Sequence, residues 1–477
     1  MTFYFYDLET SSGSPRGGRI MQFAGQRTND LLEPIGEPDN ILVKLADDII
    51  PEPDAILVHG ITPQQTLQEG ISEAKFAAYF HDKVAEPRTI FVGFNNIRFD
   101  DEFMRYMCYR TFYDPYQWHW KDGRGRWDLL DAFRMMRALR PDGLIWPMTA
   151  EGKPTVKLEE LAKVNKVVHE NAHDALSDVL ALIELARKFK QAQPKLFEYL
   201  LLARDKKHVA RLVESGDPFV YTSGKYDSEF EKTTLVKSVL KHPRREAAIV
   251  YDLRFDPARW INKPIEELVK HWSVRYGDEL EPLPVKTLQY NRCPAIAPLT
   301  VLNEASKERI GYTDAFLRHS ALIDEHPAFI QKLQEALDIL EHKQQMTLLP
   351  EPNVDSQLYD GFWTPQDQGE MINIRMSAPN LLSELQSTIK NKRLREMIPL
   401  YKARNYQALL TPEEHEQWES HRRVSFFRGG EKSVISKVSK RLEEIVKTRK
   451  LTKRDDYLLS ELQLYIESIL PEPEDSN

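Results

Sequence analysis

The chain has 477 residues, which is too long for a single hydrophobic core and predicts two to four domains. Its two cysteines exclude a disulfide framework, and no stretch approaches the roughly 18 apolar residues of a membrane helix, so we expect a cytoplasmic protein that does not enter a membrane. The formal net charge of -8 excludes little, because a binding groove needs only a local positive potential.

The first predicted element is a buried strand, since the run from Phe3 to Tyr6 is short, apolar and aromatic. It leads into Asp7 and Glu9, which share one face of a strand because they are two residues apart. Two residue rises of about 3.3 Å give the carboxylates a separation that two metal ions about 3.5 to 4 Å apart can bridge. Oxygen-only ligands favour magnesium or manganese over zinc. The alternative is that the acidic pair only ends a strand in a solvated turn.

A second acidic segment follows a predicted strand from Thr89 to Phe94. A helix begins there at Asp100, and its apolar side is formed by Phe99, Phe103, Tyr106 and Met107. Asp100 is the candidate metal ligand. Asp101 and Glu102 stay open as alternatives, because periodicity does not choose among the three. An acidic first turn that only suits the helix dipole is the other interpretation.

The next segment is unusually rich in aromatic residues, which are Phe112, Tyr113, Tyr116, Trp118, Trp120 and Trp127. Single-stranded nucleic acid is held by bases stacked on such rings, which contributes about 1 to 3 kcal/mol per base. The same rings equally suit packing in a core or a hinge. Composition therefore does not decide between these two interpretations.

The third acidic segment lies where a loop becomes a helix, because apolar residues recur at helical spacing from Ala175 onward. His173 precedes that helix, and Asp178 lies one turn inside it. Asp174 is the rival carboxylate, which we interpret as a helix cap. For His173, a capping or packing role is the alternative to catalysis.

Four carboxylates and one histidine from distant segments are what a protein needs to hold two divalent ions and activate water for phosphodiester hydrolysis. The sequence therefore predicts a metal-dependent nuclease.

The chain divides coarsely into three predicted domains. Residues 1–194 alternate strand and helix signals, contain every catalytic segment and end where Pro194 stops a long helix. Residues 195–350 predict a smaller β-rich domain with inserted helices. Its strand-like runs are residues 218–226, 247–255 and 284–291. Helical patterns dominate residues 355–477, with a clear helix start at Thr411.

Two segments cluster basic side chains. The first contains Lys237, Lys241, His242, Arg244 and Arg245. The second spans residues 432–454, where Val434, Val438, Leu442 and Ile445 line one side of a predicted helix and leave lysines on the others. The first segment predicts contacts with a phosphate backbone. The second is interpreted as a solvated amphipathic helix, and contact with a phosphate backbone is its alternative.

The three acidic segments, FYDLET, GFNNIRFDDEF and NAHDALSDV, resemble the exonuclease motifs of the DEDDh superfamily. Further segments are similar to the bacterial exonuclease I family, and they are residues 57–65, 112–120, 126–143, 291–298, 354–363 and 401–406. The similarity runs nearly end to end. It implies a multidomain α/β protein with a ribonuclease H-like exonuclease domain, whose mixed sheet is flanked by helices, then an SH3-like β-rich domain and a C-terminal helical domain.

Carried over residue by residue, the resemblance assigns Asp7, Glu9, Asp100 and Asp178 to two Mg²⁺ ions, with Mn²⁺ able to substitute. It assigns the general base to His173.

The resemblance also implies a substrate-binding set, which consists of Glu9, Thr10, Asn96 and Arg140. Thr10 matches the position that helps to seat the terminal nucleotide. One departure is visible, because residues 7–12 read DLETSS where this family is associated with DYETFG. The carboxylates are unchanged, so only packing around the 3′ nucleotide is expected to differ.

The implied activity is 3′→5′ hydrolysis of single-stranded DNA to 5′-mononucleotides, carried out processively in DNA repair and recombination. The implied partner is the acidic C-terminal tail of single-stranded DNA-binding protein, received by basic residues such as Arg140, and we expect a monomer. The alternatives are a DEDDh exoribonuclease, which the long extension beyond residue 194 disfavours, and an inactive nucleic-acid-binding scaffold, which the intact catalytic set disfavours.

Overall fold

The computed structural model describes residues 1–168, 174–274, 278–347 and 353–471. The chain forms two compact units, and each is described by itself. Unit 1 comprises Met1–Gly125, Glu170–Leu180 and Pro350–Asn477, and unit 2 comprises Arg126–His169 and Ala181–Leu349. In the part of the chain that the structure describes, no helix is both long and apolar enough to cross a membrane.

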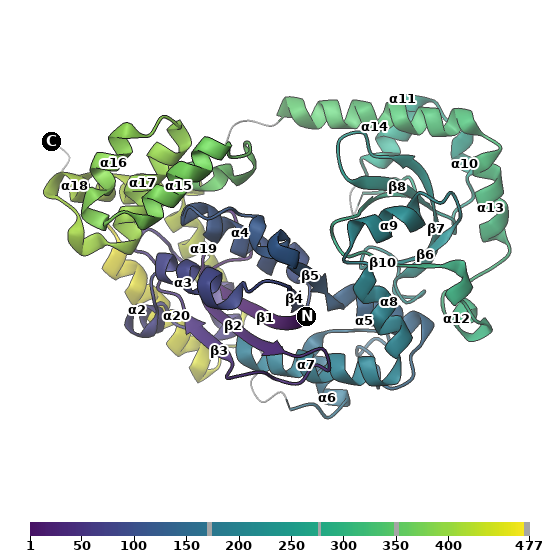
Figure 1. Cartoon of the computed structure of the whole chain (residues 1–477), viewed down its shortest axis with the longest axis horizontal. Coiled ribbons are helices and arrows are strands. Elements are labelled where there is room, and N and C mark those ends of the chain that lie inside the picture. The colour runs from purple at the N-terminus through teal and green to yellow at the C-terminus, as the bar shows by residue number, and fades with distance from the viewer. Residues whose placement is uncertain (169–173, 275–277, 348–352, 472–477) are drawn as a thin grey trace. The chain divides into compact units, whose positions relative to one another are not determined.

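Unit 1 is built on a mixed sheet (Figure 1). Its strands are β1 (Thr2–Thr10), β2 (Ile20–Thr28), β3 (Asp39–Leu42) and β4 (Thr89–Gly93), hydrogen-bonded in the order β3-β2-β1-β4. Strand β1 is antiparallel to β2 and parallel to β4. A further strand, β5 (Gly125–Asp128), begins at the last residue of this part of unit 1. The predicted first strand is confirmed, and it continues through the acidic pair rather than ending before it.

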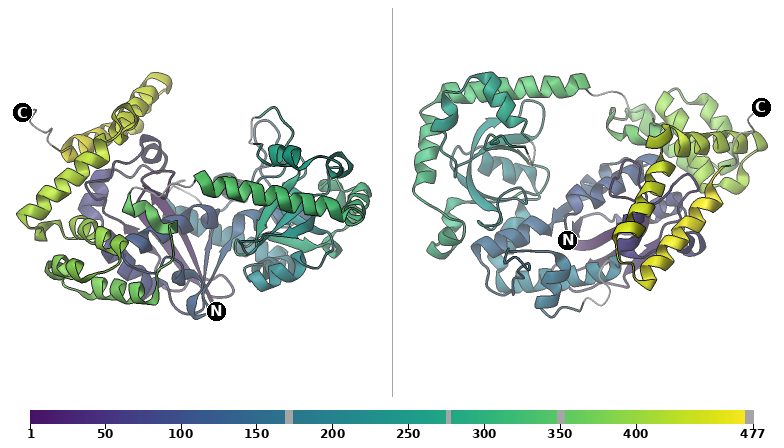
Figure 2. Two further views of the ribbon diagram at one scale, coloured as in Figure 1. Left: turned by 90° about the horizontal axis from the view of Figure 1, so that it is seen from above. Right: turned by 180° about the vertical axis from the view of Figure 1, so that it is seen from behind.

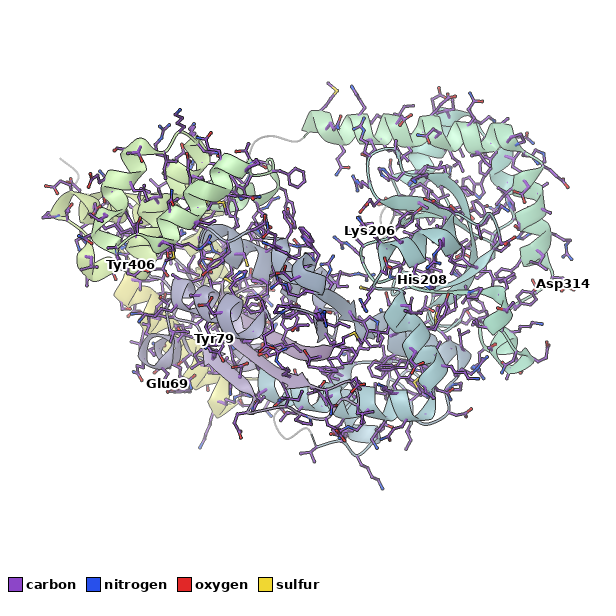
Figure 3. The ribbon with its side chains drawn as sticks, in the orientation of Figure 1. Glu69, Tyr79, Lys206, His208, Asp314 and Tyr406 are labelled. Atoms are coloured by element: carbon purple, nitrogen blue, oxygen red, sulfur yellow. The ribbon has the colours of Figure 1, made fainter. Side chains whose placement is uncertain are left out.

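The helices of the N-terminal part of unit 1 are α1 (Pro53–His59), α2 (Pro63–Glu69), α3 (Glu73–Tyr79) and α4 (Asp100–Arg110). Helices α3 and α4 cover the face of the sheet that carries Tyr4, Tyr6 and Leu8, and together they form one aromatic core. At the edge of this core, the hydroxyls of Tyr4 and of Tyr79, which is labelled in Figure 3, donate to Asp39. Side-chain alternation then places residues 3, 5, 7 and 9 on the opposite face of β1.

The C-terminal helices belong to the same unit and pack directly on its N-terminal part. They are α15 (Pro365–Met376), α16 (Leu382–Thr388), α17 (Lys392–Asn405), α18 (Pro412–Phe427), α19 (Val434–Thr448) and α20 (Lys453–Ile469). Met21 and Ile56 share a core with Leu462, and Figure 2 shows α19 and α20 in yellow beside the purple elements. Tyr109 shares a second core with Ile398. The predicted helical character of this region is confirmed.

Two local predictions for this region are also confirmed. Helix α18 begins with Thr411, whose side chain accepts from the backbone N–H of Glu414 while the Glu414 side chain accepts in return. Helix α19 is amphipathic, with Val438 and Ile445 buried. Val434 was expected on the same buried side and is instead 41% exposed, because it is the first residue of the helix.

Unit 2 contains an antiparallel sheet with the order β10-β6-β7-β8-β9. Its strands are β6 (Phe219–Thr222), β7 (Thr233–Lys241), β8 (Ala247–Asp252), β9 (Val285–Gln289) and β10 (Ala295–Pro298). The three runs that the sequence predicted correspond to β6, β8 and β9. The central strand β7 was not predicted, because its lysines led to its interpretation as part of a basic segment.

Unit 2 also contains helices, of which α14 runs along α11 (Figure 1). They are α5 (Leu129–Leu139), α6 (Leu158–Val164), α8 (Pro194–Leu202), α9 (Lys206–Val213), α10 (Ala258–Ile261), α11 (Ile265–Trp272), α12 (Glu304–Arg309), α13 (Ala315–Asp324) and α14 (Pro327–Thr347). Helix α7 (Ala175–Ala192) begins in unit 1 and ends in unit 2. The predicted stop at Pro194 is confirmed, since α7 ends at Ala192 and Pro194 opens α8.

Candidate active site

Three carboxylates converge on one face of the sheet of unit 1. Asp7 and Glu9 come from β1, and Asp178 comes from the first turn of α7. Each offers an oxygen, and the three oxygens lie within 4.8 Å of one another. The i, i+2 spacing on a strand puts the first two on the same side, as predicted, and the fold brings the third from a segment far away in sequence.

A local irregularity of β1 follows the acidic pair. Asp7 pairs with Ala24 and Glu9 with Gln22 in regular antiparallel register, and the register shifts between Glu9 and Thr10. Bulges of this kind redirect the side chains next to them and are frequent beside active sites. The carboxylates therefore lie on regular strand, immediately before the strand changes direction.

Burial and mutual repulsion make this cluster costly to ionise. Burial, followed by the charges of Asp100 and Asp178, raises the pKa of Asp7 well above its usual range. Burial, followed by the charges of Asp7 and Asp178, raises the pKa of Glu9 to about 9. A divalent cation would remove this penalty by supplying the missing positive charge.

The structure distinguishes Asp100 from its two acidic neighbours. Asp101 is fully buried and accepts a hydrogen bond of 2.5 Å from the hydroxyl of Tyr6. Glu102 forms an ion pair of 2.5 Å with Arg105. Asp100 is 3% exposed, and its charge acts on Asp7. The effect of its charge on Asp7 supports Asp100 as the predicted ligand.

The junction before α7 carries the predicted base and its neighbour. Asp174 accepts from the backbone N–H of Ser177 at 3.1 Å, so the predicted capping role is confirmed. His173 lies outside the described residues. Its role as general base therefore stays a prediction.

Sequence reasoning missed Gln22. Its side-chain amide nitrogen donates to Asp174 at 3.2 Å and to Asn40 at 2.8 Å, and it pairs with Glu9 across β1 and β2. This amide joins β2, the strand paired with the one that carries the acidic pair, to the start of α7. The available signal was a glutamine inside the apolar run IMQFAG, since a buried polar side chain needs partners.

The predicted substrate-binding residues occupy different environments. Thr10 is 6% exposed, and its hydroxyl donates to the carbonyl of Ser12 at 2.9 Å. Asn96 is fully buried, and its amide nitrogen lies 3.4 Å from Asp101. Arg140 belongs to unit 2 and donates to the carbonyl oxygens of two residues, Leu139 and Val301. Their contacts with substrate stay predictions.

Most of the aromatic stretch is core rather than an exposed stacking surface. Phe112, Trp118 and Trp127 are at most 2% exposed. Tyr113 stacks on His81, with ring centroids 4.0 Å apart. Trp120 is 58% exposed, and Tyr116 is half-buried with the Arg105 guanidinium over its ring. A contact of these two rings with a base stays a prediction.

The first basic segment is not the exposed patch that its composition suggested. Lys237 is 6% exposed and pairs with Asp324 at 2.8 Å, and His242 is also buried. The prediction of a phosphate contact is wrong for these two residues, because Lys237 lies in the middle of the central strand β7 and His242 is buried directly after its end. Lys241 and Arg245 reach the surface, where each faces a glutamate.

The donor set fits a divalent cation. Asp7, Glu9 and Asp178 offer only carboxylate oxygens, which hard cations such as Mg²⁺ and Mn²⁺ prefer over the nitrogen and sulfur ligands typical of zinc. A bound cation would stabilise the ionised form of these close carboxylates, whose pKa values are raised in its absence.

Three protein families match the chain in succession. The family described as "Exonuclease" matches residues 4–186, "Exonuclease I SH3-like domain" matches residues 204–338, and "Exonuclease I C-terminal domain" matches residues 352–469. The predicted architecture of an exonuclease domain, an SH3-like domain and a C-terminal helical domain is confirmed.

Known proteins are similar over most of the chain. Exodeoxyribonuclease I of Escherichia coli (strain K12) is 37% identical over 432 residues, which are 89% of this chain and 90% of that protein. The crystal structure of E. coli exonuclease I in complex with a dA16 oligonucleotide has a TM-score of 0.92 at 35% identity, covering 98% of this chain and 99% of that one. The zinc-bound form of an E. coli exonuclease I complex with single-stranded DNA has a TM-score of 0.90 at 34% identity with the same coverage.

Proposed function

The chain belongs to the exonuclease I family, and on this premise we propose that it removes nucleotides from the 3′ end of single-stranded DNA and releases 5′-mononucleotides. The observation that carries the proposal is the grouping of Asp7, Glu9 and Asp178 within 4.8 Å, beside the charge of Asp100. We propose two Mg²⁺ ions as the cofactor, with Mn²⁺ able to substitute, because every ligand is a carboxylate oxygen.

Each residue has a proposed part in the reaction. Bound divalent ions would offset negative charge on the scissile phosphate and lower the pKa of water. Asp7 and Glu9 hold their carboxylates on a rigid strand, and Asp178 holds a third on a helix. His173 accepts a proton from the attacking water. The water oxygen bonds to phosphorus, the bond to the 3′ oxygen breaks, and the released nucleotide keeps the 5′ phosphate.

The test compares three 5′-labelled substrates, namely single-stranded DNA, duplex DNA and single-stranded RNA, with Mg²⁺, with Mn²⁺ and with a chelator. We expect rapid shortening of single-stranded DNA from its 3′ end, dependent on either metal ion. Preferential shortening of RNA would favour an exoribonuclease. Strand binding without shortening would favour an inactive scaffold.

We further propose a processive monomer of the cytoplasm that acts in DNA repair and recombination, recruited by the acidic tail of single-stranded DNA-binding protein. Arg140 is the proposed contact, since a guanidinium suits a carboxylate. Binding of a labelled tail peptide by wild type, Arg140→Ala and the exposed control Arg318→Ala tests this contact. Equal affinities of all three would remove Arg140 from the proposal.

A further inference from the structure

Unit 2 contains a cavity of about 870 Å³ that is lined by none of the candidate active-site residues. It lies at the edge strand β9, between the loop that joins β6 to β7, the C-terminal end of α11 and residues 311–316. Cavities that bind small molecules commonly measure about 300 to 1,000 Å³, so a nucleotide-sized ligand fits this one.

Aromatic side chains line much of the cavity. Tyr226, Phe230, Phe255 and Trp272 come from three separate segments, and Phe255 is 42% exposed. Gly311 lets the Phe230 ring approach closely, because its φ is +64° and a Cβ there would lie 2.6 Å from the ring. Rings that are partly exposed and held in place by their surroundings suit the stacking of a planar ligand.

Cations hold these rings in position. The Lys286 ammonium lies 4.6 Å from the ring centroid of Tyr226, and the Arg254 guanidinium lies 5.4 Å from the same centroid and 5.3 Å from that of Phe230. Arg254 donates to both oxygens of Asp252, so its charge is largely compensated. Contacts of this kind fix the aromatic wall before any ligand enters.

The lining also has polar groups with capacity for a ligand. Lys225 is exposed at the rim, and cations outnumber carboxylates among the lining side chains. The Tyr226 hydroxyl is buried away from solvent, so it is the ring of Tyr226 that the cavity offers to a ligand.

The loop that shapes the cavity has a strained backbone. Glu231 and Lys232 are consecutive non-glycine residues with φ values of +52° and +56°. Lys232 in turn donates to the backbone carbonyl of Tyr226 at 2.9 Å, which anchors the ring. Such strain costs of order 1 to 3 kcal/mol per residue and is frequent at ligand-binding loops.

We propose that this cavity binds one nucleotide unit, with its base against Tyr226, Phe255 and Trp272 and its phosphate near Lys225. The aromatic surface suits a base, and the adjacent cation suits the phosphate joined to it. A ligand that carries both groups therefore fits the cavity better than a ligand that carries one. The unit is either a free 5′-mononucleotide or one nucleotide of a strand. The inference rests on the proposed function, because that activity would supply both.

The test uses the full chain labelled with 5-fluorotryptophan, in a chelator so that no hydrolysis occurs. The chain has eight tryptophans, and loss of one fluorine signal in Trp272→Phe assigns the reporter. We titrate dAMP, a four-nucleotide strand and inorganic phosphate. We expect the Trp272 signal to move with dAMP or with the strand, and not with phosphate.

Variants separate stacking from charge. Phe255→Leu and Lys225→Glu are each expected to raise the Kd at least about fivefold, while Phe255→Tyr keeps the ring and stays within about twofold of wild type. The controls are Lys195→Glu and Leu202→Ala, which are exposed residues of unit 2 outside the cavity, and both are expected to bind like wild type.

Every outcome bears on the proposal. A response to dAMP supports the free nucleotide as the source, and a response to the strand alone supports a bound strand. An equal response to phosphate, or no response to any probe, overturns the proposal. DNA hydrolysis with Mg²⁺ is measured on the same preparation. Hydrolysis without a Trp272 response overturns the cavity proposal alone, and a response without hydrolysis overturns the proposed function alone.

Discussion

At the scale of single residues, burial of the acidic cluster lowers the stability of the metal-free protein at high pH, and the proposed metal ions would offset this cost. Glu9 has its pKa raised from 4.5 to about 9, so the folded metal-free protein holds a proton that the unfolded chain releases between those values. The free energy of unfolding is therefore expected to fall as pH rises through this window. Metal binding displaces the proton, so uptake of Mg²⁺ is expected to release protons.

Asp7→Asn tests this balance. We expect it to abolish hydrolysis, because a metal ligand is lost, and to stabilise the metal-free protein at pH 8, because one repelling charge is removed from Glu9 and Asp178. Urea unfolding in a chelator at pH 5, 7 and 9 measures the effect, with cleavage of labelled DNA alongside. Wild-type turnover, or an unchanged dependence of stability on pH, would contradict the assignment.

The choice among the three neighbouring carboxylates is a second residue-scale prediction. Asp100→Asn is expected to lose most hydrolysis and to change the dependence on Mn²⁺, because this carboxylate acts on Asp7 and is a proposed metal ligand. Asp101→Asn is expected to act through stability, since it weakens the bond from Tyr6, and Glu102→Gln is expected to be mild. Equal and mild losses of rate in all three variants would show that the ligand is misplaced.

His173 has a separate prediction, because its proposed role is proton transfer rather than metal binding. His173→Ala is expected to lower the rate by about 10² to 10⁴, the usual contribution of a positioned general base. Metal affinity, measured by calorimetry on the same variant, should change little. If the rate matched wild type across the pH range, another group would have to act as the base.

At the scale of elements, helix α17 is joined to the N-terminal part of unit 1 by buried ion pairs. Arg404 pairs with Asp48 at 2.7 Å and with Asp355 at 2.6 Å, and Arg19 also pairs with Asp355. Although burial opposes ionisation, these arginines hold the pKa of Asp355 at about 2 and that of Asp48 well below its usual range. The network contributes stability that is present above about pH 4 and is lost as pH falls through the lowered values.

Arg404→Met tests how much free energy is lost when Asp48 and Asp355 stay buried without this arginine. We expect a loss of about 3 to 5 kcal/mol at pH 7, since both are left buried with less compensation. The loss should shrink toward pH 4, where Asp48 and Asp355 in the variant take up protons more readily. Lys392→Met on the same helix is the control, because Lys392 is 81% exposed and its change should stay within about 0.5 kcal/mol. Equal destabilisation of the two variants in urea would contradict a role for the network.

At the scale of the whole molecule, catalytic and C-terminal parts share cores. Met21, Ile56 and Tyr109 are fully buried against the C-terminal helices. A fragment of residues 1–194 would expose these side chains to water, at a cost of roughly 1.5 to 3 kcal/mol for each large one. We therefore expect it to aggregate or unfold at lower temperature than the full chain. A monomeric fragment with the Tm of the full chain would refute this expectation.

The sequence by itself determined the local chemistry of this protein. The i, i+2 spacing predicted that Asp7 and Glu9 share a face of a strand. Helical periodicity predicted the start of α7 at Ala175, and Thr411 predicted the start of α18. These features depend on contacts within a few residues, which a sequence displays directly. The resemblance to exonuclease I predicted the order of the domains.

Only the tertiary structure decided which side chains meet across long stretches of sequence. It placed Asp178 beside Asp7, hydrogen-bonded the Tyr6 hydroxyl to Asp101, and hydrogen-bonded the Gln22 amide to Asp174. It also buried Lys237, which composition had suggested for an exposed patch. Composition records charge but not burial, and burial depends on which elements pack together. The sequence therefore supplied the candidate residues of the site, whereas the partners of the described ones followed from packing between distant segments.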